Sequence, residues 1–189
     1  MSKINLFYGV VNSRKSAELI LTIHRNREIA GKSILVLQSS INSRDGGYIT
    51  SRALKYKEKA EVVFEQTNIK DLYKGEQMIL IDEIQFFTKE HIDQLIDISL
   101  EHEVLIFCYG LMSDFRGKLF ETIQYLLPFC TKIVEIPTVC EECGKRKATM
   151  NKMIGNVADN NGISVGNHYL GVCLKCFYKN NQITLDKIT

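Results

Sequence analysis

Apolar segments alternate with helical patterns along most of the chain, from residue 3 to about residue 137. Six short runs are rich in Val, Ile, Leu and Phe, and we expect strands at 4–8, 33–38, 61–64, 78–81, 104–108 and 132–136. Such runs are typical of parallel strands, because crossover helices bury them on both faces. The pattern therefore predicts an α/β domain at 1–137, built on a parallel sheet flanked by helices.

Three longer segments between these runs have helical periodicity. The first covers 16–30, the second follows Thr88, and the third starts near residue 118. Threonine commonly caps a helix N-terminus, because its hydroxyl accepts a free backbone N–H. The segment 39–52 is rich in Ser, Asn and Gly without a clear period, and we expect a mobile loop there.

Composition limits the classes of partner. A chain of 189 residues suffices for one packed core. Its apolar runs fall short of the roughly 20 residues of a membrane span, and its first residues lack the pattern of a signal peptide. We therefore expect a cytoplasmic protein without a membrane partner. The net charge of +2, with scattered Lys and Arg, argues against nucleic acid as a partner.

A candidate phosphate-binding loop follows the first predicted strand and leads into the first predicted helix. It matches three of the four fixed positions of the G-x-x-x-x-G-K-[ST] motif. In this motif the lysine reaches the terminal phosphates of a nucleotide, the hydroxyl binds Mg²⁺, and the helix N-terminus supplies N–H donors. We expect ATP to be bound by Gly9, Val10, Val11, Asn12, Ser13, Arg14, Lys15 and Ser16.

Arg14 stands where the motif has glycine. Glycine at this position keeps side-chain bulk away from a backbone that wraps phosphates. We therefore expect Arg14 to weaken ATP binding, unless its side chain swings outward or contacts a phosphate. For this motif taken alone, an ordinary strand-to-helix turn with a chance Lys-Ser pair remains the alternative.

Two carboxylates follow the fourth predicted strand. We expect Asp82 on the magnesium side of a bound nucleotide, and Glu83 as the general base that accepts a proton from an attacking hydroxyl. The alternative is a solvated acidic segment before a helix. Gln85 and Phe86 suit a hydrogen-bonding and stacking wall for an aromatic ligand, although Phe86 and Phe87 alone are more typical of a core.

Two C-x-x-C pairs lie late in the chain, and their four sulfurs are Cys140, Cys143, Cys173 and Cys176. Paired knuckles of this kind are typical of a tetrahedral structural zinc site. Disulfides or a redox C-x-x-C fit neither a cytoplasmic protein nor two matching pairs. We expect Zn²⁺ to hold a long excursion between the pairs, and we expect Cys108 and Cys130 to be inert core residues.

The phosphate loop, the segments 81–87 and 108–120 and the late cysteine pairs together resemble the zinc-containing thymidine kinases of bacteria, large DNA viruses and animal cytosol. The match runs from residue 4 to about residue 178. The resemblance implies a P-loop-type sheet with a small C-terminal zinc-ribbon/lid domain at 138–178 and a tail at 179–189. It also implies transfer of the γ-phosphate of ATP to the 5′-hydroxyl of thymidine, with Mg²⁺ and structural Zn²⁺, in a homotetramer or homodimer.

The resemblance also implies roles for individual residues. Glu83 would be the catalytic base, Asp82 and Gln85 would flank the nucleotide, and Arg44 would lie near the phosphates. Part of the thymidine site would be a lid whose backbone reads the pyrimidine edge. The predicted thymidine-binding residues are Phe86, Leu111, Phe115, Phe120, Ile163, Ser164, Val165, Gly166 and Tyr169.

Two other hypotheses stay open. Because of Arg14, the chain could be a catalytically weakened paralogue that binds nucleosides or nucleotides. It could also be a zinc-ribbon adaptor for nucleic acid or protein that uses the basic triplet 145–147, although such a triplet is more typical of a solvated zinc-knuckle surface. Salt-sensitive DNA binding without nucleoside affinity would indicate the adaptor.

Overall fold

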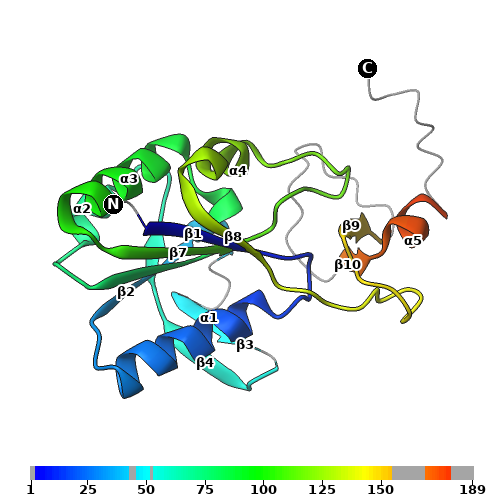
Figure 1. The fold of residues 1–189 in the computed structure, drawn as a ribbon, viewed down its shortest axis with the longest axis horizontal. Helices are drawn as coiled ribbons and strands as arrows, with labels where there is room; N and C mark the ends of the chain where they lie inside the picture. Colours follow the sequence, from blue (N-terminus) through cyan, green and yellow to red (C-terminus); the bar gives the residue numbers. More distant parts are fainter. Residues whose placement is uncertain (1–2, 43–45, 52, 155–168, 180–189) are drawn as a thin grey trace.

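The computed structural model describes residues 3–42, 46–51, 53–154 and 169–179. Its centre is a six-stranded parallel sheet with the strand order β5-β2-β6-β7-β1-β8 (Figure 1). The strands are β1 (Lys3–Tyr8), β2 (Ile34–Ser39), β5 (Glu61–Val63), β6 (Met78–Asp82), β7 (Leu105–Gly110) and β8 (Cys130–Glu135). All six predicted strands are confirmed, with ends that differ by one or two residues.

Helices cover both faces of this sheet, as the alternating pattern predicted (Figure 1). On one face α1 (Lys15–His24), which continues as a π-helical turn at Arg25–Ile29, packs Leu19, Ile20 and Ile23 against β2, β6 and β7. The other face carries α2 (Ile69–Leu72), α3 (Lys89–His102) and α4 (Glu121–Leu126).

Thr88 caps α3 as expected, because its hydroxyl accepts the N–H of His91 while the His91 ring accepts the N–H of Thr88.

The parallel register brings the ends of β1, β6 and β7 to one edge of the sheet. Tyr8 at the end of β1 pairs with Gly110 at the end of β7, and Ile81 near the end of β6 pairs with Cys108 of β7. The loops that follow β1, β6 and β7 therefore start side by side. This edge is where ligands bind in open parallel sheets.

Two local expectations differ from the structure. The segment 39–52, expected as a loop, contains a 3-10 turn (Ser40–Asn42) and strand β3 (Tyr48–Ser51), which pairs antiparallel with β4 (Tyr56–Lys59). Alternate burial stabilises β3, because Ile49 packs into the α1-side core while its neighbours stay exposed.

The third helix begins at Glu121 rather than near residue 118. The reason is a turn before it, in which the Asp114 carboxylate accepts the backbone N–H groups of Arg116 and Lys118.

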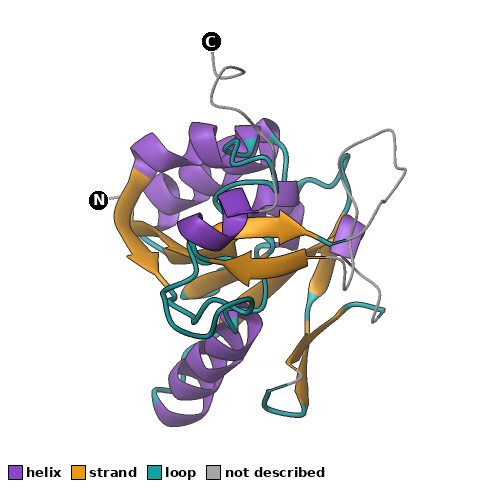
Figure 2. Cartoon of the chain, turned by 90° about the vertical axis from the view of Figure 1, so that its right-hand side faces the viewer, coloured by secondary structure: helices purple, strands orange, loops and turns teal. Residues whose placement is uncertain are grey.

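A smaller unit lies beyond the carboxyl edge of the sheet, and Figure 2 shows its two strands in front of that edge. It contains β9 (Met150–Met153), β10 (Tyr169–Val172) and α5 (Leu174–Lys179). Its own apolar cluster combines Val172 and Phe177 with cysteine side chains. This cluster supports our division of the chain at about residue 138, which stays a proposal. Among the described residues, no helix combines the length and apolar character needed to cross a bilayer.

Candidate functional site

The phosphate loop connects β1 to α1 at the carboxyl edge of the sheet. A Cβ atom on Gly9 would lie 2.4 Å from Oγ of Ser13 and 2.8 Å from the carbonyl oxygen of Ile136, so the turn has room only for glycine. The N–H of Ser13 donates to the carbonyl of Val10 and closes the turn. The hydroxyl of Ser13 is buried without a hydrogen-bond partner in the described part of the chain. A buried hydroxyl without a partner fits a loop that binds a polar ligand.

Lys15 is the first residue of α1, and its ammonium group lies inside the loop. Its Nζ donates to the carbonyl oxygens of Val10 at 2.9 Å and Gly9 at 3.3 Å, and the residue is only 6% exposed. Burial lowers the pKa of Lys15, while the carboxylates of Glu83 and Asp82 act in the opposite direction. A buried lysine beside two acids is therefore positioned inside the loop.

Arg14 and Asn12 both have left-handed backbone conformations, with φ of 67° and 59°. Asparagine tolerates this region, whereas for arginine it costs roughly 1–2 kcal/mol. The left-handed backbone at position 14 explains why the motif has glycine there. The sequence alone did not show this backbone requirement. The departure at Arg14 thus carries conformational strain in addition to side-chain bulk.

Asp82 ends β6 and faces the phosphate loop. Its Oδ2 accepts a hydrogen bond of 3.1 Å from the Ser16 hydroxyl. Burial, together with the charge of Glu83, raises the pKa of Asp82 to about 7, although Lys15 and the Ser16 hydroxyl oppose the shift. A serine hydroxyl and a buried carboxylate are the oxygen ligands that Mg²⁺ prefers beside nucleotide phosphates, so this pair fits a magnesium ion.

Glu83 follows Asp82 directly and turns the chain with a φ of 54°. Its Oε2 accepts a hydrogen bond of 2.5 Å from the side-chain amide of Gln85, whose Oε1 accepts the backbone N–H of Leu111 at 2.9 Å. A Cβ on Gly110 would lie 2.5 Å from Oε1 of Gln85, so a glycine there permits this arrangement. Gln85 thus joins Glu83 to the loop after β7. Its predicted contact with the nucleotide stays a prediction, as does the contact of Leu111 with thymidine.

Aromatic side chains lie along the loop that connects β7 to α4. Phe86 and Phe120 meet edge to face with ring centroids 6.2 Å apart, and Phe115 lies 6.1 Å from Tyr169 of β10. Two pairs of predicted thymidine-binding residues are therefore brought together from separate segments. Phe87 is buried in the main core instead. The predicted site residues Arg44, Ile163, Ser164, Val165 and Gly166 lie outside the described residues.

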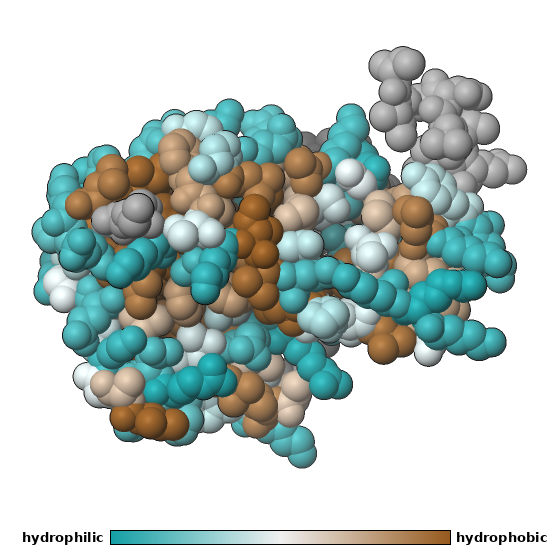
Figure 3. Space-filling view, viewed as in Figure 1, coloured by the Kyte–Doolittle hydropathy of each residue, from teal (hydrophilic) through white to brown (hydrophobic). Residues whose placement is uncertain are grey.

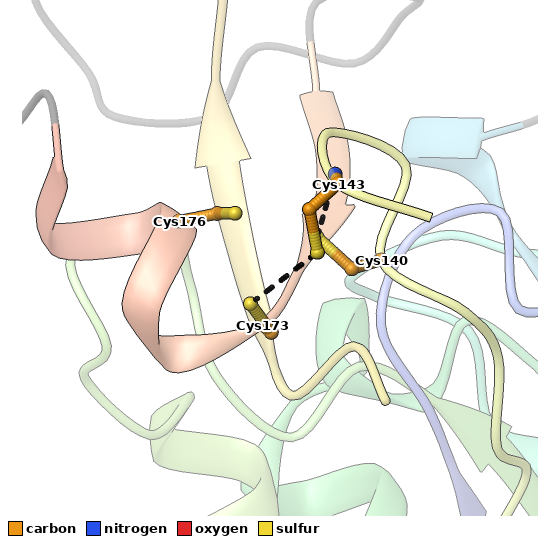
Figure 4. Close-up of side chains that lie close together, drawn as sticks. All are labelled: Cys140, Cys143, Cys173 and Cys176. Carbon is orange, nitrogen blue, oxygen red and sulfur yellow. Dashed lines mark hydrogen bonds between the residues drawn. The ribbon is translucent and has the colours of Figure 1, made fainter. Parts of the chain in front are cut away.

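The four late cysteines converge in the smaller unit. Figure 4 shows their side chains pointing toward one another, and their sulfur atoms all lie within 4.8 Å of one another. Four sulfurs about 2.3 Å from a tetrahedral zinc ion would be separated by about 3.8 Å. Although burial raises the pKa of Cys140, backbone N–H groups from Cys173 and Cys143 help to lower it to about 6. All six cysteines are free of disulfides, so the donor set fits structural Zn²⁺.

Sequence reasoning missed two residues that shape this site. Gly110 was visible only as a glycine at a strand end, and the need for it becomes clear from the position of Gln85. Asn151 is a buried polar residue of β9 that contacts the phosphate loop. Its strand is four residues long, so no periodic signal identified it.

Comparisons with known proteins identify the family of the chain. The family model for thymidine kinase matches residues 2–177. A thymidine kinase of Lactiplantibacillus plantarum is 40% identical over 156 residues, which cover 80% of each chain. A thymidine kinase of Streptococcus gordonii is 36% identical, and the match covers 95% of this chain and 97% of the relative. A thymidine kinase of Listeria monocytogenes serotype 4b is also 36% identical, and the match covers 93% of this chain and 96% of the relative. The chain belongs to the thymidine kinase family.

Proposed function

We propose that this chain transfers the γ-phosphoryl group of ATP to the 5′-hydroxyl of thymidine, with Glu83 as the general base. The observation that carries the proposal is the position of Glu83. Its charge acts on both Lys15 and Asp82, and its carboxylate is held by Gln85, which also binds the loop after β7. Glu83 therefore connects the candidate ATP side of the site to the candidate nucleoside side.

The phosphate side has the groups that phosphoryl transfer requires. Lys15 provides a buried positive charge, and the N-terminus of α1 directs its N–H groups toward the loop. Ser16 and Asp82 would hold Mg²⁺, which when bound offsets the negative charge of the phosphates. Positioning and electrostatic stabilisation then supply most of the rate enhancement.

Glu83 would accept the proton of the 5′-hydroxyl as that oxygen attacks the γ-phosphorus atom. The hydrogen bond from Gln85 fixes Oε2 and so orients Oε1. Gln85 is in turn held by the N–H of Leu111, so the orientation of the base depends on the loop after β7. The same loop carries Phe115 and Phe120, which we propose contact thymine together with Phe86 and Tyr169.

The remaining predicted partners also belong to this proposal. Structural Zn²⁺ bound by the four cysteines would hold the two ends of the lid segment together. We keep a homotetramer or homodimer as the predicted assembly, which light scattering after size exclusion would test. A surface that supports it lies on edge strand β8, where Ile133 and Val134 are exposed and Figure 3 shows a hydrophobic band. A cytoplasmic location stays a prediction and suits the free cysteines.

The alternatives are less well supported. Relatives that match most of this chain are named thymidine kinases, which does not favour a weakened paralogue. The basic triplet at 145–147 is exposed, and Lys147 forms an ion pair with Glu135, as expected for a solvated knuckle surface.

One assay tests the proposed activity. We expect the wild-type chain to phosphorylate thymidine with ATP and Mg²⁺, and we expect Glu83→Gln to reduce kcat by about 10²–10⁴-fold, the usual contribution of a general base. ATP affinity should stay close to that of the wild type, because Gln keeps the shape of the side chain. Glu90→Gln, on the exposed start of α3, is the matched control. Retained turnover in Glu83→Gln would remove Glu83 from this role.

A further inference from the structure

The smaller unit that carries β9, β10, α5 and the four cysteines, hereafter the zinc-binding unit, contacts the phosphate loop directly. The contact is made by two residues that face each other on its small sheet. Asn151 of β9 pairs with Gly171 of β10, and directly opposed residues in antiparallel strands share a face. Oδ1 of Asn151 accepts the backbone N–H of Val11 at 2.8 Å. A Cβ on Gly171 would lie 2.6 Å from Cγ2 of Val10 and 2.9 Å from the carbonyl oxygen of Val11. This face of the unit is therefore fitted closely to the loop backbone.

The same asparagine also binds the loop after β7. Its Nδ2 donates to the carbonyl oxygen of Ser113 at 2.8 Å, and the residue is only 4% exposed. One planar amide thus joins the backbone of the phosphate loop to the segment that carries Phe115. Both the oxygen and the nitrogen of this buried amide have a hydrogen-bond partner, which fixes the orientation of the side chain.

The phosphate loop requires external support because of its own backbone. Asn12 and Arg14 are both left-handed, and strained conformations persist only where surrounding contacts determine them. Besides the bond from Val11 to Asn151, the side chain of Asn12 donates to Glu141 at 3.1 Å. Oε2 of Glu141 also accepts the N–H of Gly171 at 2.6 Å. Several of the contacts that hold the strained loop thus come from the zinc-binding unit.

We propose that Asn151 is a positioning residue for the phosphates of ATP, and that it holds the phosphate loop in its binding conformation from the zinc-binding unit. The positioning acts through the hydrogen bond from the N–H of Val11 to Asn151, and the fit of the opposed Gly171 against Val10 supports the same loop backbone. This inference rests on the proposed function, since it concerns the same ATP site. It gives the zinc-binding unit a role on the ATP side in addition to its predicted role as a lid over thymidine.

A pair of variants with matched shape isolates the hydrogen bonds. Asn151→Val removes both bonds, whereas Asn151→Thr has the shape of valine and keeps one hydroxyl that can accept from Val11 or donate to Ser113. The measurement is titration calorimetry of ATP with Mg²⁺ into the zinc-loaded full chain without thymidine. We expect Asn151→Val to raise the Kd for ATP about tenfold, the effect of losing a buried hydrogen bond, and Asn151→Thr to raise it less, because its hydroxyl keeps part of the polar contact.

Zinc content and melting temperature are measured on the same samples, with Thr149→Val as the exposed control. Equal ATP affinity of Asn151→Val and the wild type would overturn the inference, as would weaker ATP binding by Asn151→Thr than by Asn151→Val. If Asn151→Val fails to fold or loses zinc, Gly171→Ala tests the same contact between the zinc-binding unit and the phosphate loop. Its added Cβ should displace Val10 and weaken ATP binding, and an unchanged Kd for ATP would contradict the inference. A wild-type chain that binds no ATP would overturn the proposed function itself, whereas the other outcomes leave that function standing.

Discussion

Replacing Arg14 with glycine should stabilise the phosphate loop, because the backbone there is left-handed with a φ of 67° and a ψ of 27°. A non-glycine residue in this region costs roughly 1–2 kcal/mol. Glycine also gains about 0.5–1 kcal/mol of backbone entropy in the unfolded chain, which offsets part of the benefit. The net expectation for Arg14→Gly is an increase of about 0.5–1 kcal/mol in the free energy of unfolding. For a chain of this size that corresponds to a rise of roughly 1–4 °C in Tm.

ATP binding should respond in the same direction. If the strain lets the loop leave its binding conformation, removing the strain with glycine should tighten ATP binding. The gain in binding free energy is at most about 0.5–1 kcal/mol, which corresponds to about a two- to fivefold lower Kd. Arg14→Ala is the matched control, since it removes the same side chain but keeps the cost of the left-handed backbone. We therefore expect the glycine variant to exceed the alanine variant in both Tm and ATP affinity, measured by calorimetry.

The comparison of these variants separates two explanations. If the arginine side chain contacts a phosphate, both variants lose ATP affinity relative to the wild type. If the backbone conformation matters, only the glycine variant gains. Equal Tm values for Arg14→Gly and Arg14→Ala would refute the reasoning from backbone strain.

Two further predictions concern the acids of the site. Gly110→Ala should lower kcat about 10–100-fold and keep the affinity for ATP, because the added Cβ would displace the Gln85 amide that orients Glu83. Steady-state kinetics would test this, and an unchanged kcat would argue against the positioning role of Gln85. Asp82 has a pKa of about 7 in the folded chain, against an ordinary value of 3.8, so the folded state holds a proton that the unfolded state releases between these values. Without Mg²⁺, the free energy of unfolding of the wild type should therefore decrease as the pH rises from about 4 to 7. The side-chain amide in the Asp82→Asn variant does not titrate, so the free energy of unfolding of the variant relative to the wild type should increase across this pH range in denaturant titrations. A difference that does not change with pH would contradict the raised pKa.

The sequence predicted the parts of the fold that depend on periodic or strongly typed residues. Buried strands such as β6 are continuous apolar runs, and Thr88 is a residue type with a clear capping role. The cysteine cluster followed from spacing alone, since paired C-x-x-C units have few other uses. In each of these cases a local pattern is sufficient to indicate the structure.

The features that the sequence did not predict depend on tertiary contacts. Strand β3 is short and polar, and its signal is the burial of Ile49 against α1, which no local pattern shows. The role of Gln85 as a bridge requires knowledge that the ends of β6 and β7 are neighbours. Asn151 contacts Val11, a residue 140 positions away in sequence. The backbone strain at Arg14 is likewise visible only in dihedral angles.

The two carbonyl oxygens that accept hydrogen bonds from Lys15 also bear on which anions the loop selects. An arriving anion has to compete with the carbonyl groups of Val10 and Gly9 for the same ammonium hydrogens. A small, singly charged anion gains little from this exchange, since its own loss of water is not repaid. A polyphosphate chain bound as we propose would also reach the N–H groups of α1, and its larger charge would offset the exchange. In that case the internal hydrogen bonds of the loop would favour long phosphate chains over free inorganic anions in the same solution.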